Sequence, residues 1–258
     1  MTRVIAFAHN KGGTGKTTSC LNLGAALSER GHRVLLVDVD PQGHLAQSLG
    51  FEPDRLGQTL YDALTDVIQD GSADAHALIL QTDEGMDLLP SNLDLSLAEL
   101  DLQNAIRREY ALSRVLEPLR ADYDYILIDC PPSLGILVVN ALAAADGVIV
   151  PMQVEFLAAK GVGRLLRLVE RVRRTGLNPN LQIEGLLLTM AHQRTTHARD
   201  VIDGIQAAYG TLRIFETLIP RSIRFPEAAA AGQSILAYGP GRDVAGAYRQ
   251  LAEEVDGG

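Results

Sequence analysis

The chain has 258 residues, 47% of them hydrophobic, which is enough to bury one sizeable α/β core. Its formal net charge of −9 excludes a uniformly basic nucleic-acid binder, and no apolar run is long enough to predict a transmembrane helix. Two cysteines indicate a reducing compartment rather than a disulfide scaffold, and the first residues lead directly into a predicted strand, so we expect no signal peptide. We therefore predict a cytoplasmic protein with a single domain over residues 1–258.

Apolar runs alternate with segments of helical periodicity along the chain. Strands are expected at 4–8, 33–38, 77–80, 86–90, 125–129, 147–151, 183–189 and 217–220. Helices are expected at 20–27, from 59, over 94–119 with room for one break, and at 134–145, 158–175, 197–209 and 241–254. The alternation predicts an α/β fold with a doubly wound, mainly parallel sheet flanked by helices, whose ligand lies beyond the carboxyl ends of the strands.

Residues 10–18 join the first strand to the first helix and read Asn-Lys-Gly-Gly-Thr-Gly-Lys-Thr-Thr. A glycine-rich turn between a strand and a helix lets backbone N–H groups surround a phosphate, and the positive end of the helix points at the same place. Lys16 is placed to reach the outer phosphates and the Thr17 hydroxyl to hold Mg²⁺. The pattern departs from the ordinary phosphate loop, because Asn10 stands where a glycine is expected and a second lysine, Lys11, follows it. We predict that ATP and magnesium bind to Lys11, Gly12, Gly13, Thr14, Gly15, Lys16, Thr17 and Thr18.

Three carboxylates follow predicted strands that end near this loop. Asp129 ends an apolar strand, the usual place for a residue that holds the water shell of a loop-bound magnesium ion. Asp40 lies in a turn from which it can orient a water molecule that attacks the terminal phosphate, although an Asx-turn before Pro41 explains it equally well from spacing alone. Asp38 is assigned to magnesium or to orienting the loop.

One basic stretch stands out in an otherwise acidic chain. Residues 160–224 hold 11 basic and 5 acidic residues, whereas residues 1–159 hold 10 basic and 22 acidic ones. This distribution is typical of a directed anion-binding face, and a solvated helix face is the competing interpretation. Within the stretch, the helical spacing places on one face Arg164, Arg167, Arg171 and Arg174, and loops after predicted strands carry Arg194, Arg221 and Arg224.

Five blocks occur in an order and at spacings that resemble a known family. They are Lys11–Thr18, Val37–Gly43, Tyr123–Gly135, Leu186–Met190 and Ile219–Arg224. Together they resemble the ParA/Soj family of deviant-Walker-motif partition ATPases, part of the ParA/MinD superfamily, and the resemblance covers nearly the whole chain. The Asp-x-Asp-Pro-Gln-Gly and Asp-Cys-Pro-Pro-Ser-Leu-Gly blocks are more specific than the phosphate loop.

The resemblance implies an ATPase, weak without a partner, that forms a homodimer with ATP sandwiched between its subunits. Its catalytic residues would be Lys16, Asp40 as the hydrolytic residue, and Lys11 reaching across the dimer. The ATP-bound dimer would bind DNA without sequence preference on the nucleoid, and a ParB-like partner would stimulate hydrolysis and release it, which would segregate a plasmid or chromosome. Family position also suggests DNA contacts at Arg194 and Arg224, and adenine contacts at Met190, Pro220 and Arg221.

The chain departs from the family pattern at His44, Lys160 and Thr196, and again over residues 225–229. These departures leave the partner and the cargo open, and a positioner of a non-DNA cargo on the nucleoid is an alternative. A MinD-like membrane-associated ATPase is a weaker one, because the last residues are acidic and poor in large apolar side chains. Weaker still are a reductase with a shared iron–sulfur cluster, whose cysteines do not fit, and a metabolic synthetase of the same fold.

Overall fold

A seven-stranded sheet forms the centre of the molecule. The computed structural model describes residues 1–154, 159–191, 203–204 and 207–257. Within them the strand order is β3-β4-β2-β5-β1-β6-β7, and every neighbouring pair is parallel except β3 with β4. This confirms the predicted mainly parallel sheet. The strands are β1 (Arg3–Phe7), β2 (Val34–Asp38), β3 (Leu80–Gln81), β4 (Asp87–Leu89), β5 (Tyr125–Asp129), β6 (Gly147–Gln153) and β7 (Gln182–Thr189).

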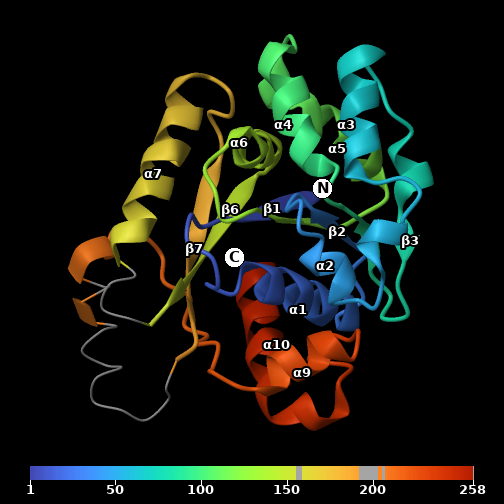
Figure 1. Cartoon of the computed structure of the whole chain (residues 1–258). Coiled ribbons are helices and arrows are strands. Elements are labelled where there is room, and N and C mark those ends of the chain that lie inside the picture. The colour runs from blue at the N-terminus through green and yellow to red at the C-terminus, as the bar shows by residue number, and fades with distance from the viewer. Residues whose placement is uncertain (155–158, 192–202, 205–206, 258) are drawn as a thin grey trace.

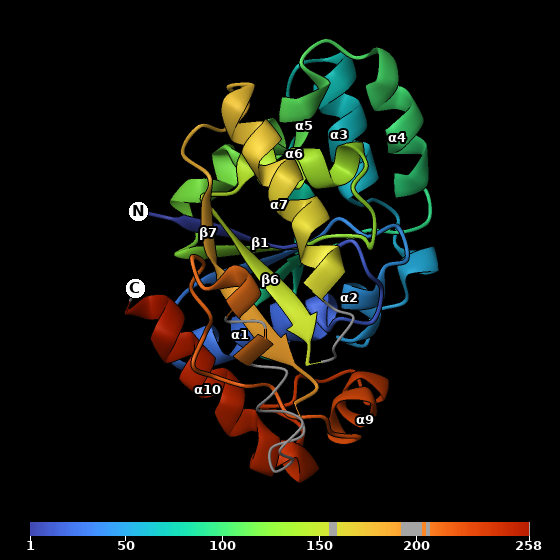
Figure 2. The same ribbon diagram turned by 90° about the vertical axis from the view of Figure 1, so that its left-hand side faces the viewer.

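Helices cover both faces of the sheet, as Figures 1 and 2 show. One layer holds α3 (Leu60–Gln69), α4 (Leu95–Asn104), α5 (Ala111–Leu116), α6 (Ile136–Ala144) and α7 (Ala159–Arg174). The other layer holds α1 (Lys16–Glu29), α2 (His44–Gln47), α9 (Arg224–Ala230) and α10 (Arg242–Asp256).

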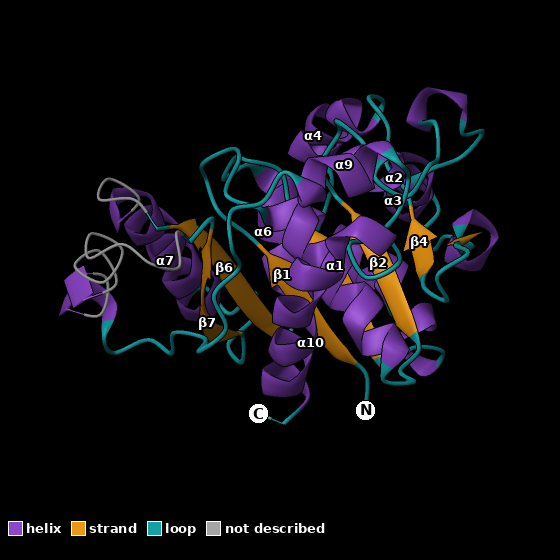
Figure 3. Ribbon diagram, turned by 90° about the horizontal axis from the view of Figure 1, so that it is seen from below, coloured by secondary structure: helices purple, strands orange, loops and turns teal. Residues whose placement is uncertain are grey.

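Each layer encloses its own hydrophobic core, because side chains along a strand point alternately to the two faces. In β1, Val4 and Ala6 belong to the core under α3 to α7, while Ile5 and Phe7 belong to the core shared with α1 and α10. Seen from below, α1 and α10 lie next to each other on the same face of the sheet (Figure 3). Burial on both faces explains why the central strands are continuous apolar runs.

Parallel pairing brings the ends of β2 and β5 together. Asp38 and Asp129 are paired across these strands, and the phosphate loop follows β1, the neighbour of β5 on its other side. Three of the predicted site segments therefore meet at the carboxyl edge of the sheet, as the topology predicted. No helix in the described part of the chain is long and apolar enough to cross a membrane.

Several local predictions were wrong. The segment predicted as a strand at 77–80 is mainly a 3-10 helix, Ala75–Leu78, and 217–220 makes only an isolated bridge through Pro220. The stretch 94–119 is broken more than once, into α4, two 3-10 turns and α5. The short helices α2 and α9 were not predicted, and most of the helix expected at 197–209 lies outside the described residues. Thr59, by contrast, does begin α3 with a capping box.

Candidate functional site

The phosphate loop has the backbone conformation that its glycines predict. Gly13 and Gly15 adopt left-handed φ angles of 71° and 86°, which side chains disfavour. Gly15 is the residue before α1. Because glycine has no side chain, the first N–H groups of the helix have no side-chain cap. The loop and the helix N-terminus thus present backbone donors and a positive dipole end to one space, which is the arrangement that binds a phosphate chain.

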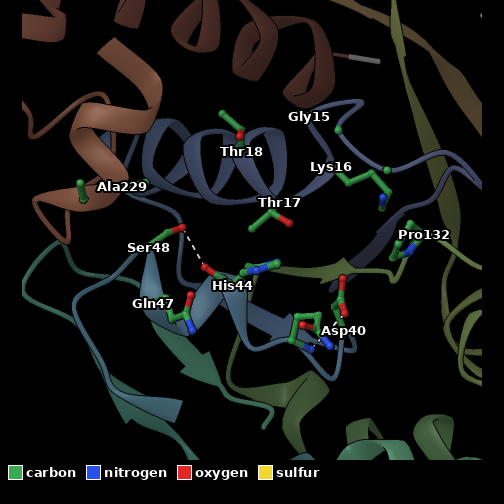
Figure 4. A pocket seen from close by; sticks show the side chains of 14 residues that line it. Gly15, Lys16, Thr17, Thr18, Asp40, His44, Gln47, Ser48, Pro132 and Ala229 are labelled. Atoms are coloured by element: carbon green, nitrogen blue, oxygen red, sulfur yellow. Dashed lines mark hydrogen bonds between the residues drawn. The ribbon is translucent and has the colours of Figure 1, made fainter. Parts of the chain in front are cut away.

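Lys16 and Asp40 face the same space from two different elements. Figure 4 shows Lys16 entering from the loop and Asp40 from the segment after β2, with Pro132 beside them. The cavity measures about 740 Å³ and also contains Thr17 and Thr18. Both charged side chains are nearly buried, Lys16 with 6% and Asp40 with 7% of its surface exposed. A cation and a carboxylate held this far from solvent interact strongly with a charged ligand between them.

Thr17 and Asp129 form a second pair on the floor of the site. The Thr17 hydroxyl donates a hydrogen bond of 2.5 Å to Oδ2 of Asp129, while Oδ1 is buried and has no hydrogen-bond partner among the described residues. Burial raises the pKa of Asp129 to about 7, against the lowering effects of the Thr17 hydrogen bond and the Lys16 charge. An orphaned carboxylate oxygen beside a hydroxyl is a donor set that fits Mg²⁺. No described cluster of His, Cys, Asp or Glu could hold a metal by itself, so the other ligands would be phosphate oxygens and water.

Asp38 uses its carboxylate to hold the segment that carries Asp40. One oxygen accepts the backbone N–H of Asp40 at 3.0 Å, and the other accepts that of Leu45 at 3.1 Å. The side chain is fully buried, and burial, together with the neighbouring Asp129 charge, raises the pKa of Asp38. Of the two roles left open for Asp38, these contacts favour orienting the loop. They fix the backbone from which the Asp40 carboxylate extends.

Asp40 makes the turn contact that its spacing predicts and also faces the cavity, so neither interpretation excludes the other. Its Oδ1 accepts the N–H of Gln42 at 3.1 Å, which is an Asx-type contact, and its carboxylate still lines the cavity with Lys16. The Asp40 backbone is anchored further by Ser91, whose hydroxyl donates to its carbonyl oxygen. A turn contact on one oxygen therefore orients the carboxylate and does not remove it from the site.

A smaller pocket of about 330 Å³ adjoins the phosphate cavity, with Gly15 and Thr18 in both walls. Met190, which has a left-handed φ of 54°, lies here directly after β7. The pocket brings together all three residues suggested as adenine contacts. Its apolar, partly aromatic lining suits a flat base, and we call it the base pocket. Its walls are formed by Gly15, Thr18, Ser19, Thr189, Met190, Ile219, Pro220, Arg221, Ser222, Phe225, Pro226, Ala229 and Tyr248.

Two aromatic residues of this pocket were not predicted to belong to the site. Phe225 of α9 and Tyr248 of α10 pack edge to face with their ring centroids 5.9 Å apart. The Tyr248 hydroxyl lies 3.2 Å from that of Ser19 in α1. Neither residue belongs to a recognisable motif. Helical periodicity indicates only that Tyr248 is a core residue. Tyr248 reaches the site through its contact with α1, more than 200 residues away in the chain.

His9, another residue without a predicted role, supports the front of the loop. It is 1% exposed, and its Nδ1 accepts the backbone N–H of Lys11 at 3.0 Å. The ring is therefore neutral, with its proton on Nε2. Burial, together with the charges of Lys16 and Lys11, lowers the pKa of His9 to about 4.

We expect this histidine to make the folded protein sensitive to acid. Its pKa is lower in the folded chain than the ordinary 6.5, so the unfolded chain binds the extra proton as the pH falls from 6.5 toward 4. The stability of the wild type should fall across this window by roughly 2 kcal/mol more than that of His9→Asn. Asn retains an acceptor at the same number of bonds from Cα and does not titrate. Urea unfolding of both proteins over this pH range measures the difference, and parallel profiles would contradict it.

The structure separates the predicted DNA-contacting arginines into two groups. Arg164, Arg167 and Arg171 are exposed on α7, opposite its buried face, and therefore share one surface. Arg224 begins α9, in the other layer of the molecule, and forms an ion pair of 2.8 Å with Glu227. Arg221 lies nearby and lines the base pocket, while Arg194, Lys160 and Thr196 fall on positions whose side chains lie outside the described residues.

Comparisons with known proteins agree with this geometry. A family model described as an AAA domain matches residues 2–183. The chain is 44% identical over 256 residues to the sporulation initiation inhibitor protein Soj of Bacillus subtilis, covering 99% of this chain and 98% of Soj. It is 43% identical over 256 residues to the chromosome partitioning protein ParA of Caulobacter vibrioides, covering 98% of this chain and 93% of that protein.

A solved structure shows the same fold with a nucleotide. Cobyrinic acid a,c-diamide synthase from Mycobacterium smegmatis, with bound ADP and magnesium, superposes with a TM-score of 0.84 at 44% sequence identity. The match covers 98% of this chain and 93% of that one. Since the family model spans most of the sequence and both relatives align with it almost end to end, the chain belongs to the ParA/Soj family of deviant-Walker-motif ATPases.

Proposed function

We propose that this protein is an ATPase whose bound nucleotide controls the attachment of a homodimer to DNA. The observation that carries the proposal is the shared cavity of Lys16 and Asp40, which continues into a pocket suited to a base. This arrangement supports the binding of a whole nucleoside triphosphate with its terminal phosphate beside a carboxylate. The relatives named Soj and ParA support a role in partition of a chromosome or plasmid on the nucleoid.

We assign the roles of the site residues according to where they lie. Lys16 and the loop N–H groups hold the outer phosphates, and Asp40 orients the attacking water. Thr17 and Asp129 would hold a magnesium ion, which would neutralise charge that develops on the phosphates. Lys11 is exposed at the front of the loop, where its ammonium can reach the nucleotide of a second subunit.

DNA binding without sequence preference requires cations that contact phosphates, and each contact contributes by releasing counterions. Arg224 is suited to this because its side chain is 40% exposed and lies on α9, next to the base pocket. A subunit with few such contacts binds DNA weakly, and dimerisation doubles them, which makes binding depend on ATP. The α7 arginines form a separate surface and are a second candidate contact.

The partner distinguishes the remaining alternatives. Release from DNA by a ParB-like protein that stimulates hydrolysis would indicate partition, whereas stimulation by a protein bound to another cargo would indicate positioning of that cargo. A MinD-like membrane attachment receives no support from α10, because its apolar residues Tyr248, Leu251 and Val255 are buried in the core beside α1.

Binding of the protein to nonspecific duplex DNA, with ATP, a non-hydrolysable analogue, ADP or no nucleotide, tests the proposal. We expect binding only with the two triphosphates and a steep decrease with salt. Arg224→Ala should weaken binding about tenfold at moderate salt and reduce the slope of log affinity against log salt by about two, one contact from each subunit.

Arg33→Ala is the matched control. Arg33 is 60% exposed and pairs with Asp124 just before β2 and β5 begin, at the edge of the sheet opposite the nucleotide. Its removal should leave DNA binding unchanged. If Arg224→Ala binds DNA like the wild type, the assigned surface is wrong, and if no nucleotide state binds DNA, the proposed function is wrong.

A further inference from the structure

Gln153, the last residue of β6, contacts three residues of the site, two in the phosphate loop and one in the wall of the base pocket. Its Nε2 donates to the carbonyl oxygen of Gly13 at 2.6 Å and lies 3.2 Å from Sδ of Met190. Its Oε1 accepts from the ammonium of Lys11 at 3.3 Å. One side chain therefore joins the phosphate loop, the wall of the base pocket and the lysine proposed to act on a second subunit.

The planar amide makes these contacts depend on one another. Its single oxygen and its NH₂ group are fixed on opposite sides, so a rotation that withdraws the oxygen from Lys11 also moves the nitrogen away from Gly13. Met190 touches the same nitrogen and forms part of the base pocket. A base that shifts Met190 therefore acts on the group that holds Lys11.

The backbone of Lys11 is fixed separately, through the hydrogen bond from its N–H to His9. Any movement of the lysine toward another subunit must therefore come from its side chain, and the contact with Gln153 holds that side chain against its own loop.

We propose that Gln153 is a positioning residue that retains the Lys11 ammonium in its own subunit until nucleotide fills the base pocket. The inference rests on the proposed function, in which Lys11 acts across an ATP-bound dimer. Gln153 would thereby set the concentration of nucleotide at which two subunits join, without taking part in the chemistry of hydrolysis.

Two variants of similar size should change dimerisation in opposite directions. Gln153→Glu replaces a neutral contact to Lys11 with an ion pair, so dimerisation should require at least about threefold more nucleotide. Gln153→Leu removes the acceptor, so dimerisation should occur at a nucleotide concentration at least about threefold lower. Sedimentation velocity across a titration with magnesium and a non-hydrolysable ATP analogue measures both midpoints.

The controls separate positioning from damage to the fold. Gln81→Glu and Gln81→Leu make the same changes at an exposed position on the edge strand β3 and should leave the midpoint unchanged. Damage to the loop would shift both Gln153 variants toward weaker dimerisation, so shifts in the same direction, or no shift in either, overturn the inference about Gln153. A wild type that stays monomeric at saturating analogue overturns the proposed dimer itself, and the inference with it.

Discussion

Replacement of Asp40 by alanine should lower ATP hydrolysis at least about 100-fold while ATP affinity stays within about threefold of the wild type. The carboxylate lines the cavity opposite Lys16, where it can orient a water molecule but is not needed to hold the phosphates. Its backbone contacts to Asp38 and Ser91 do not involve the deleted atoms, so the loop should keep its course although the N–H of Gln42 loses its acceptor. Phosphate release and calorimetric titration with the nucleotide measure the two effects.

Asp83→Ala provides the comparison, because Asp83 is an exposed carboxylate outside the phosphate cavity. It should hydrolyse ATP at the wild-type rate. Asp40→Ala should also accumulate in the ATP-bound state, which would prolong any DNA-bound form. Hydrolysis at a normal rate in Asp40→Ala would show that another group orients the water, and loss of ATP binding would show that Asp40 mainly maintains the loop.

Lys16→Ala should weaken ATP binding at least about 100-fold. Lys16 is nearly buried and lines the cavity, where the attraction of its charge for a phosphate is screened little by water. The deletion also removes a charge that lowers the pKa of Asp129, so the carboxylate next to Thr17 becomes easier to protonate and less able to hold magnesium. Titration with a fluorescent ATP analogue, with and without magnesium, measures the loss.

Lys11→Ala is the informative control for this result. Both substitutions remove one positive charge from the same loop, but Lys11 is exposed and its ammonium contacts Gln153. It should keep most of the affinity of the monomer for ATP and fail to form the dimer. Equal loss of ATP affinity in both variants would contradict the different roles assigned to the two lysines.

The parts of the fold that the sequence predicts well are those governed by local chemistry. The central strands are recognisable because burial on both faces requires continuous apolar runs, and the loop because only glycine adopts the angles at Gly13 and Gly15 readily. The stretch 94–119 was less predictable, since its breaks depend on packing: Asn140 of α6 bonds the N–H of Leu112 and the carbonyl of Arg108. These contacts join residues about 30 positions apart.

The same distinction holds within the site. The strand-end position of Asp38 and Asp129 follows from topology, and the structure brings them together. Spacing could not show that both carboxylate oxygens of Asp38 accept hydrogen bonds from backbone amides, because this depends on the path of the turn up to Leu45. Gln153 and His9 were missed because nothing in a neutral amide or a single histidine indicates a loop contact before the strands are placed next to one another.

The phosphate cavity and the base pocket are built from different parts of the chain, so they form at different stages of synthesis. A nascent chain that has emerged from the ribosome as far as α7 already contains the complete phosphate loop, Asp40 and Asp129, but lacks Phe225 and Tyr248. The base pocket forms only when α10 docks against α1 and the Tyr248 hydroxyl reaches Ser19. We therefore expect firm retention of ATP to require the last stage of folding.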